Sequence, residues 1–158
     1  MKIDAVKATP VTIGFTEPEI WSQGVRHGVT AIVVEVITDS GLVGIGESVP
    51  APSPEVTVAA IDSTARLILG KDPRQIQQCW LDMQSLGGWC SFPYVCNAAL
   101  AGVEIALWDI LGKSLNAPVH ALLGGAIRSR VPIMGFVQHT TPEKIECDAR
   151  DMAARGYT

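Results

Sequence analysis

The sequence has 158 residues, of which 47% are hydrophobic and 18% are charged, and these proportions are typical of a globular domain with a sizeable core. The formal net charge is −4 and the lysines and arginines are scattered, which argues against nucleic acid as a partner. Every long apolar run contains charged residues and the first residues lack a secretory h-region, so we expect no membrane partner and a cytoplasmic protein.

The first third of the chain predicts a small antiparallel sheet. Residues 2–13 alternate between apolar and polar side chains, which indicates a first strand. Residues 14–28 mix glycine, proline and polar residues without a period, so we expect a loop there. Residues 29–38 are rich in β-branched side chains, and residues 42–48 resume after a turn, which together predict a hairpin. The three segments would form a three-stranded meander.

Two helices are expected next, because each of two prolines follows a residue that can cap a helix. Ser53 would cap a helix over residues 54–70, and Asp72 would cap a helix over residues 73–86. A loop over residues 89–94 would lead into the following element. These helices and the meander together indicate an α+β domain.

The most apolar stretch, residues 98–125, predicts a long helix that is buried nearly all round and therefore packs against neighbours on every side. Asp109 and Lys113 stand four residues apart in the order that supports a helix. Pro118 can begin a second, short helix, which the glycine pair at 124–125 would end.

The last part of the chain changes in character. Residues 131–137 are apolar on both faces, which suits a strand of a parallel sheet covered on two sides. Thr141 can cap a helix that Pro142 opens and Gly156 ends. A parallel strand needs partners reached by crossover connections, so we interpret this strand and helix as the start of a larger sheet, or as a piece that docks onto something else.

The sequence contains no complete catalytic or cofactor motif of the common kinds. The Gly44-Ile45-Gly46 fragment predicts close packing or a β-bulge rather than phosphate binding. Glu47 can face a substrate or, more simply, accept backbone donors in a turn. Glu104 and Asp109 are five residues apart on the expected helix and cannot share a metal ion from one face.

The cysteines show no C-x-x-C pairing and no histidine at zinc spacing. We expect them to be reduced, buried thiols, in keeping with a cytoplasmic setting. They are Cys79, Cys90, Cys96 and Cys147.

A resemblance to a known family is carried by the central stretch. From Ala99 the chain reads A-L-A-G-V-E-I-A-L-W-D-I-L-G-K and then, after four residues, P-V-H-A-L-L-G, which resembles the mandelate racemase and muconate lactonizing branch of the enolase superfamily. The segments G-L-V-G-I-G-E at 41–47 and R-x-x-V-P-I at 128–133 are similar as well. The resemblance implies an α+β capping domain over residues 1–125, followed at 126–158 by the truncated start of a (β/α) TIM-like barrel.

The resemblance also implies a reaction. Enzymes of this family bind Mg²⁺ and stabilise the enediolate that forms when a lysine or histidine removes the proton next to a carboxylate. The chain would then be the amino-terminal part of a racemase or cycloisomerase that takes a small-molecule carboxylate and forms a homo-oligomer. An acid-sugar dehydratase of the same family is one alternative, and a non-catalytic, stand-alone α+β interaction module is another.

No catalytic or metal-binding residue of the family is carried over to this chain, because the base and the three metal ligands would lie beyond residue 158. We therefore expect this chain alone to be inactive.

In similar enzymes, two loops of the capping domain close over the mouth of the barrel and select the substrate. An arginine in such a loop could face a carboxylate. His139 follows the expected strand at 131–137, and active sites of such barrels gather at the carboxyl ends of strands, so it is the candidate at the barrel mouth, with a solvated loop histidine as the alternative. The residues that fall in the two loops are Phe15, Trp21, Arg26, His27, Val49 and Pro50.

Overall fold

The computed structural model of the protein describes residues 1–85, 93–137 and 141–157. The chain separates into two compact units. The first unit consists of residues 1–12 and 30–125, and the second consists of residues 13–29 and 126–158.

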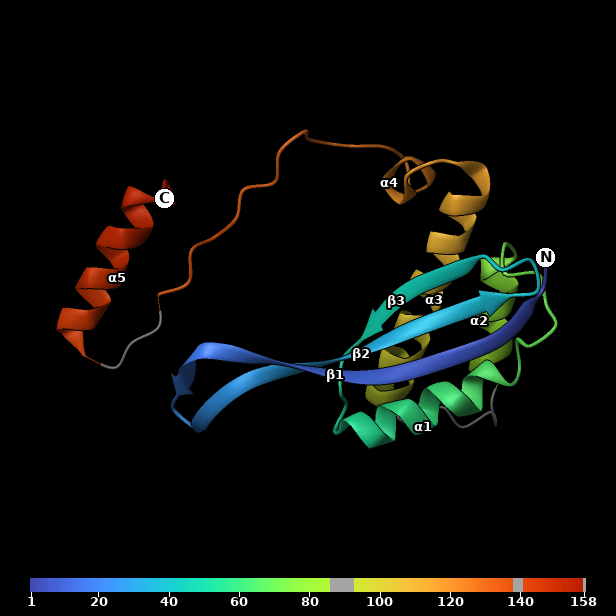
Figure 1. The fold of residues 1–158 in the computed structure, drawn as a ribbon, viewed down its shortest axis with the longest axis horizontal. Helices are drawn as coiled ribbons and strands as arrows, with labels where there is room; N and C mark the ends of the chain where they lie inside the picture. The colour runs from blue at the N-terminus through green and yellow to red at the C-terminus, as the bar shows by residue number, and fades with distance from the viewer. Residues whose placement is uncertain (86–92, 138–140, 158) are drawn as a thin grey trace. The chain divides into compact units, whose positions relative to one another are not determined.

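The first unit is built on an antiparallel sheet of three strands in the order β1-β2-β3 (Figure 1). The strands are β1 (Ile3–Trp21), β2 (Gly24–Thr38) and β3 (Val43–Ser48). Strand β2 pairs with β3 in a register that places Val34 opposite Gly46 and Val36 opposite Gly44. The three-stranded meander expected from the sequence is confirmed.

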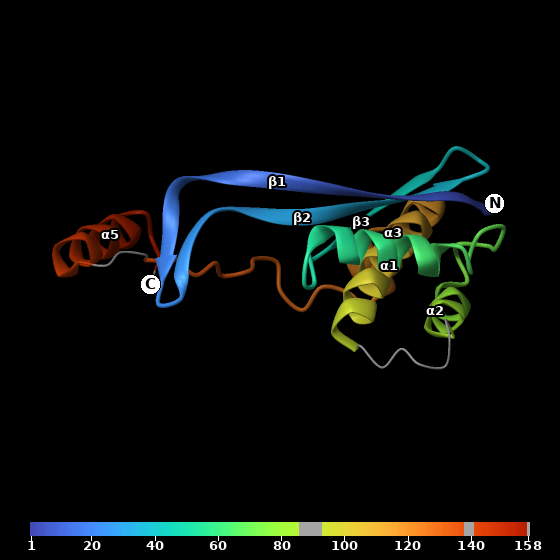
Figure 2. The same cartoon turned by 90° about the horizontal axis from the view of Figure 1, so that it is seen from below.

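Helices cover one face of this sheet (Figure 2). The side chains of Ile32, Val34 and Val36 alternate along β2 and are fully buried, because this face of the strand meets the helices. The described helices are α1 (Pro54–Ala65), α2 (Ile76–Gln84), α3 (Pro93–Leu115) and α4 (Val119–Leu122) in this unit, and α5 (Pro142–Ala154) in the other.

Helix α3 is the central element, as the sequence predicts. By length and composition alone, Tyr94–Leu115 could cross a membrane, but the helix packs against β3, α1 and α2 and contributes the buried Val103, Leu107 and Ile110 to the core. The expectation that the helix is buried nearly all round is wrong, because Ile105 and Leu115 are 49% and 58% exposed on the side that no other described element covers.

The contact between α3 and β3 is made by backbone atoms. A Cβ atom on Gly46 would lie 2.0 Å from the carbonyl oxygen of Gly102, and one on Gly44 would lie 2.1 Å from that of Ala106. Only glycine leaves room for a helix at this distance. The close-packing role expected for the Gly44-Ile45-Gly46 fragment is therefore correct.

Helix α3 ends in a Schellman motif. Asn116 adopts a positive φ of 50°, and the Ala117 amide donates to the Gly112 carbonyl at 2.9 Å. Gly112 lets this turn fold back, since a Cβ there would lie 2.8 Å from the Ala117 carbonyl oxygen. Pro118 precedes the short helix α4 and does not begin it, which corrects the expected start.

The helix starts also differ from the expected capping. The Ser53 hydroxyl donates to Glu55 Oε2 at 2.7 Å instead of capping α1. Asp72 accepts from the Arg74 amide at 3.0 Å, which closes a local turn, and α2 begins only at Ile76. Short polar side chains that bond to a near neighbour cannot also bond to the helix.

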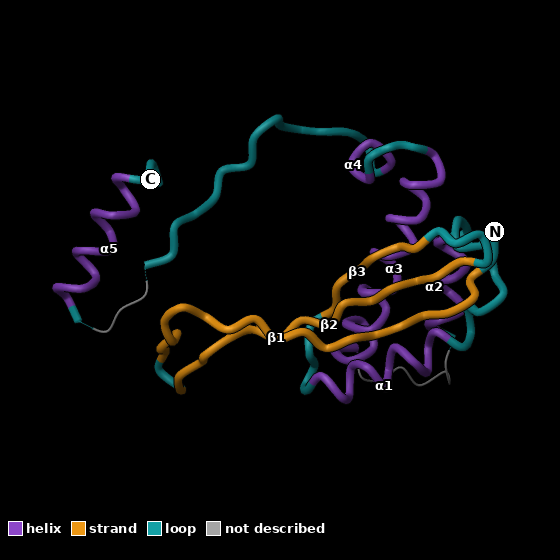
Figure 3. The backbone as a smooth tube through the Cα atoms, in the orientation of Figure 1, coloured by secondary structure: helices purple, strands orange, loops and turns teal. Residues whose placement is uncertain are grey.

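The loop expected at residues 14–28 is instead a β-hairpin, and this is the largest correction in the fold (Figure 3). Both arms stay in strand conformation up to the turn at Ser22-Gln23. The two arms approach closely, because a Cβ on Gly28 would lie 2.5 Å from the Ile13 carbonyl oxygen. Side chains here are largely exposed on both faces, so the residues carry no apolar–polar alternation that would reveal a strand.

The second unit contains this hairpin, the segment 126–137 and helix α5. The strand expected at 131–137 is not formed, because these residues pair with no other strand in the described chain. Val131, Ile133 and Phe136 are 74%, 75% and 67% exposed. The helix expected to follow is confirmed as α5.

The cysteines differ in their surroundings. Cys79 is a buried free thiol, as expected, and burial raises its pKa. Cys96 is partly buried, while Cys147 is exposed on α5, so the expectation of burial is wrong for Cys147. Cys90 lies outside the described residues.

Candidate functional site

The tip of the hairpin gathers three residues of the first of the two loops that the family resemblance led us to expect. The Arg26 guanidinium carbon lies 5.5 Å from the centre of the Phe15 ring and 5.7 Å from that of the Trp21 ring. These distances are within the range of cation–π attraction. Phe15, Trp21 and Arg26, together with Glu19 described next, are called the tip cluster.

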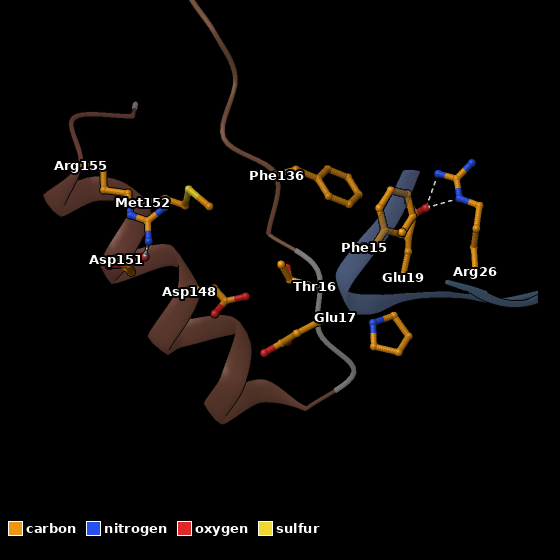
Figure 4. A pocket seen from close by; sticks show the side chains of 12 residues that line it. Phe15, Thr16, Glu17, Glu19, Arg26, Phe136, Asp148, Asp151, Met152 and Arg155 are labelled. Atoms are coloured by element: carbon orange, nitrogen blue, oxygen red, sulfur yellow. Dashed lines mark hydrogen bonds and ion pairs between the residues drawn. The ribbon is translucent and has the colours of Figure 1, made fainter. Parts of the chain in front are cut away.

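Glu19 occupies the charged end of Arg26. The Arg26 Nε atom donates to Glu19 Oε2 at 2.5 Å, and the two groups also form an ion pair through Arg26 Nη2. Figure 4 shows the carboxylate and the guanidinium facing each other. An arginine in this loop does face a carboxylate, but that carboxylate belongs to the same hairpin.

The tip cluster therefore presents an amphipathic, electrically neutral surface. Trp21 is 47% exposed and Phe15 is 36% exposed, so part of each ring is open to solvent. Aromatic rings can cover the apolar part of a small molecule. The paired charges beside them can hydrogen-bond to its neutral polar groups.

The second unit has an open pocket of about 720 Å³ beside the tip cluster (Figure 4). Both of its guanidinium groups are paired, since Arg155 Nη2 lies 2.9 Å from Asp151 Oδ2 and Arg26 is held by Glu19. Carboxylates outnumber guanidiniums in the lining, which disfavours an anion. The lining residues are Gly14, Phe15, Thr16, Glu17, Pro18, Glu19, Arg26, Phe136, Asp148, Asp151, Met152 and Arg155.

The second expected loop lies in the first unit, between β3 and α1. Val49 is 55% exposed, and Pro50 is partly buried. The next residue, Ala51, is fully buried, and its amide donates to the hydroxyl of Thr57 at 2.8 Å. The loop is therefore attached to α1 immediately after the two residues that the sequence singled out.

The remaining candidates are placed as follows. His27 lies exposed on β2 of the hairpin, and Glu47 is exposed on β3. His139 lies outside the described residues. Sequence reasoning missed Glu19. An acid and a base on the two arms of a hairpin would have been the signal, but these residues were expected to form a loop.

The described residues offer no metal site. In residues 1–85, 93–137 and 141–157, no three His, Cys, Asp or Glu side chains gather closely enough to hold a metal ion. Glu104 accepts from Trp108 Nε1 at 3.4 Å, and Asp109 accepts from the Ile45 amide at 2.8 Å. The two helix carboxylates thus have structural partners, as the spacing predicts.

The fold and the sequence together identify the class. The family described as "Mandelate racemase / muconate lactonizing enzyme, N-terminal domain" matches residues 4–124. The chain belongs to this family, within the enolase superfamily, and its first unit has the fold of the capping domain.

The chain is similar to several particular proteins of this family. A D-galactonate dehydratase family member from Paenibacillus sp. is 36% identical over 135 residues, which are 84% of this chain and 33% of the relative. The N-succinyl Arg/Lys racemase of Bacillus cereus superposes with a TM-score of 0.88 at 28% identity over 99% of this chain and 42% of that one. A family member from Roseovarius nubinhibens, solved with magnesium, gives a TM-score of 0.84 at 29% identity over 100% and 43%. The chain thus spans about a third of the length of the curated relatives it matches.

Proposed function

We propose that this chain supplies the substrate-selecting lid of a Mg²⁺-dependent enzyme that removes the proton next to a carboxylate, of the racemase or cycloisomerase type. The observation that carries the proposal is the family match over residues 4–124, on a fold shared with the racemase of Bacillus cereus. The capping-domain residues then act by binding and excluding water, and the proton transfer falls to groups outside this chain.

Within that role, the two loops have different tasks. The tip cluster covers the apolar part of the substrate with Phe15 and Trp21, while the pairing of Arg26 with Glu19 keeps the surface neutral. Val49 and Pro50, in the other unit, are the second group of residues that we propose to select the substrate. We propose Mg²⁺ as the cofactor, a cytoplasmic location and a homo-oligomeric assembly, and no metal ligand is assigned to this chain because its described residues form no such group.

The second candidate is an acid-sugar dehydratase of the same family. It is favoured by the relative at 36% identity, which is named for D-galactonate dehydratase. Both candidates begin with loss of the proton next to the carboxylate, but the dehydratase then eliminates water.

The test uses the protein encoded by the complete open reading frame, with Mg²⁺ and a panel of carboxylic acids in D₂O. Loss of the α-proton signal by NMR, without loss of water from the substrate, is the expected outcome. Formation of a keto acid from D-galactonate or D-gluconate would select the dehydratase. A reading frame that stops after Thr158, with no exchange for any acid, would contradict both and favour the interaction module.

A further inference from the structure

The loop after β3 is attached to α1 through one buried hydroxyl group. Thr57 Oγ1 accepts a hydrogen bond from the Ala51 amide at 2.8 Å and donates one to the Val49 carbonyl at 3.3 Å. Thr57 and Ala51 are both fully buried. One side chain thus bonds to the backbone on both sides of Pro50.

The neighbouring hydroxyl does not duplicate this role. Ser48 Oγ lies 2.6 Å from the Ala98 carbonyl and 3.4 Å from the Val49 carbonyl, so its single proton belongs to the shorter bond. Among the described side chains, Thr57 is therefore the donor that serves the Val49 carbonyl. The Ala51 amide depends on Thr57 as well, because a buried N–H that loses its acceptor has no water to replace it.

Val49 combines exposure to solvent with a hydrogen-bonded backbone carbonyl. Val49 is 55% exposed as a residue although its carbonyl is bonded. Loops are usually more mobile than the elements they connect, but the backbone of this loop is held by two hydrogen bonds to Thr57.

We propose that Thr57 is a positioning residue, which fixes the backbone of Val49–Ala51 so that Val49 and Pro50 form a preset wall of the lid. The backbone part of this proposal stands on the two hydrogen bonds alone. Its consequence for substrate rests on the proposed function.

The helix offers a matched control. Thr64 is also on α1 and only 3% exposed, but its hydroxyl bonds to the carbonyls of Ala60 and Ile61, both at 3.0 Å, within its own helix. Thr64→Val removes the same hydroxyl from the same helix without touching the loop.

The experiment is amide hydrogen exchange of the 158-residue chain by NMR. The wild-type Ala51 amide should be protected. Thr57→Val should speed its exchange, relative to core amides of α3, by about tenfold or more, since the lost hydroxyl is the acceptor that the described residues give this amide. Thr57→Ser should retain protection, and Thr64→Val should leave the ratio unchanged.

Several outcomes would overturn the proposal. One is a wild-type Ala51 amide that exchanges as fast as an amide of an unstructured peptide. This outcome can be observed without any variant. Another is equal loss of protection in Thr57→Val and Thr64→Val. If Thr57→Val does not fold, the comparison of wild type with Thr57→Ser decides, and loss of Ala51 protection in the serine variant contradicts the hydroxyl's role.

The substrate arm is measured on the complete enzyme. Thr57→Val should raise KM by about tenfold with a smaller change in kcat, Thr57→Ser should restore KM, and Thr64→Val should change neither. A protected Ala51 amide together with unchanged KM would refute the substrate role alone. Absence of activity in the wild type would refute the proposed function while the exchange result still decides the backbone role.

Discussion

Asp109 Oδ2 accepts a hydrogen bond from the Ile45 amide at 2.8 Å, so a side chain of helix α3 completes the outer edge of strand β3. Lys113 Nζ lies 2.7 Å from the same carboxylate oxygen and donates to the Val43 carbonyl at 2.8 Å. The i,i+4 pair that the sequence indicates is therefore also a cover for an exposed strand edge, which otherwise invites pairing with another chain.

Asp109→Ala should destabilise the first unit by about 1 kcal/mol, because the Ile45 amide and Lys113 both lose a partner that is partly exposed to solvent. Asp109→Asn keeps an acceptor for the amide and should cost less. Urea unfolding followed by circular dichroism measures the difference. Equal losses for the two variants would contradict the role of the Ile45 bond.

Gly46→Ala should destabilise the chain by about 3 kcal/mol, because the added Cβ would lie 2.0 Å from the backbone oxygen of Gly102, which cannot move without shifting α3. Gly24→Ala is the matched control, since no atom lies within 4 Å of a Cβ there. Thermal unfolding of both variants checks the prediction. A Gly46→Ala protein as stable as Gly24→Ala would show that α3 does not rest on this strand.

Asp72 should titrate far below an ordinary aspartate. The Arg74 side-chain hydrogen bond lowers its pKa from 3.8 to about 2, with help from the Arg74 amide. A depressed carboxyl pKa stabilises the fold above the unfolded value and loses that stabilisation as the pH falls from about 4 towards 2. Carboxyl-detected NMR titration of wild type and Arg74→Met measures this, and the variant should titrate nearer the ordinary value. An unchanged pKa in Arg74→Met would reject the cause.

Glu19→Gln should unmask Arg26 at the tip cluster. On the proposed lid role, the complete enzyme should then gain about tenfold in kcat/KM for acids with a second, distal carboxylate, since a charge-assisted pair becomes available. The double variant Glu19→Gln/Arg26→Leu should lose that gain. Steady-state kinetics with paired mono- and dicarboxylic acids decides, and a gain that survives in the double variant would exclude Arg26 as its source.

The sequence identified the core elements because their burial leaves a pattern. Val34 and Val36 alternate along β2 and point into the core, and residues 98–115 are mostly apolar because α3 has neighbours on several sides. The Gly44 and Gly46 pair was readable for the same reason, as two missing side chains in a strand next to a helix.

The hairpin and the tip cluster were not readable, since the forces that shape them leave no periodicity. Residues 14–28 pair through backbone hydrogen bonds and keep their side chains largely exposed, so nothing distinguishes them from a loop with glycine and proline. Glu19 and Arg26 meet only because the chain reverses at Ser22-Gln23. For residues 131–137 the error was the reverse, since a strand was predicted and none is formed. An apolar run indicates a strand only where pairing partners are present.

Because the backbones of α3 and β3 are in direct contact, positions along the chain differ in the substitutions that they can tolerate. Any side chain larger than a hydrogen atom at Gly44, Gly46 or Gly102 would overlap a neighbouring atom. These three positions therefore tolerate almost no residue other than glycine. Exposed positions such as Trp21 and Val49 carry no such restriction. If the proposed lid role holds, new substrate preferences can therefore be introduced at these exposed positions without disturbing the contact between α3 and β3 on which folding depends.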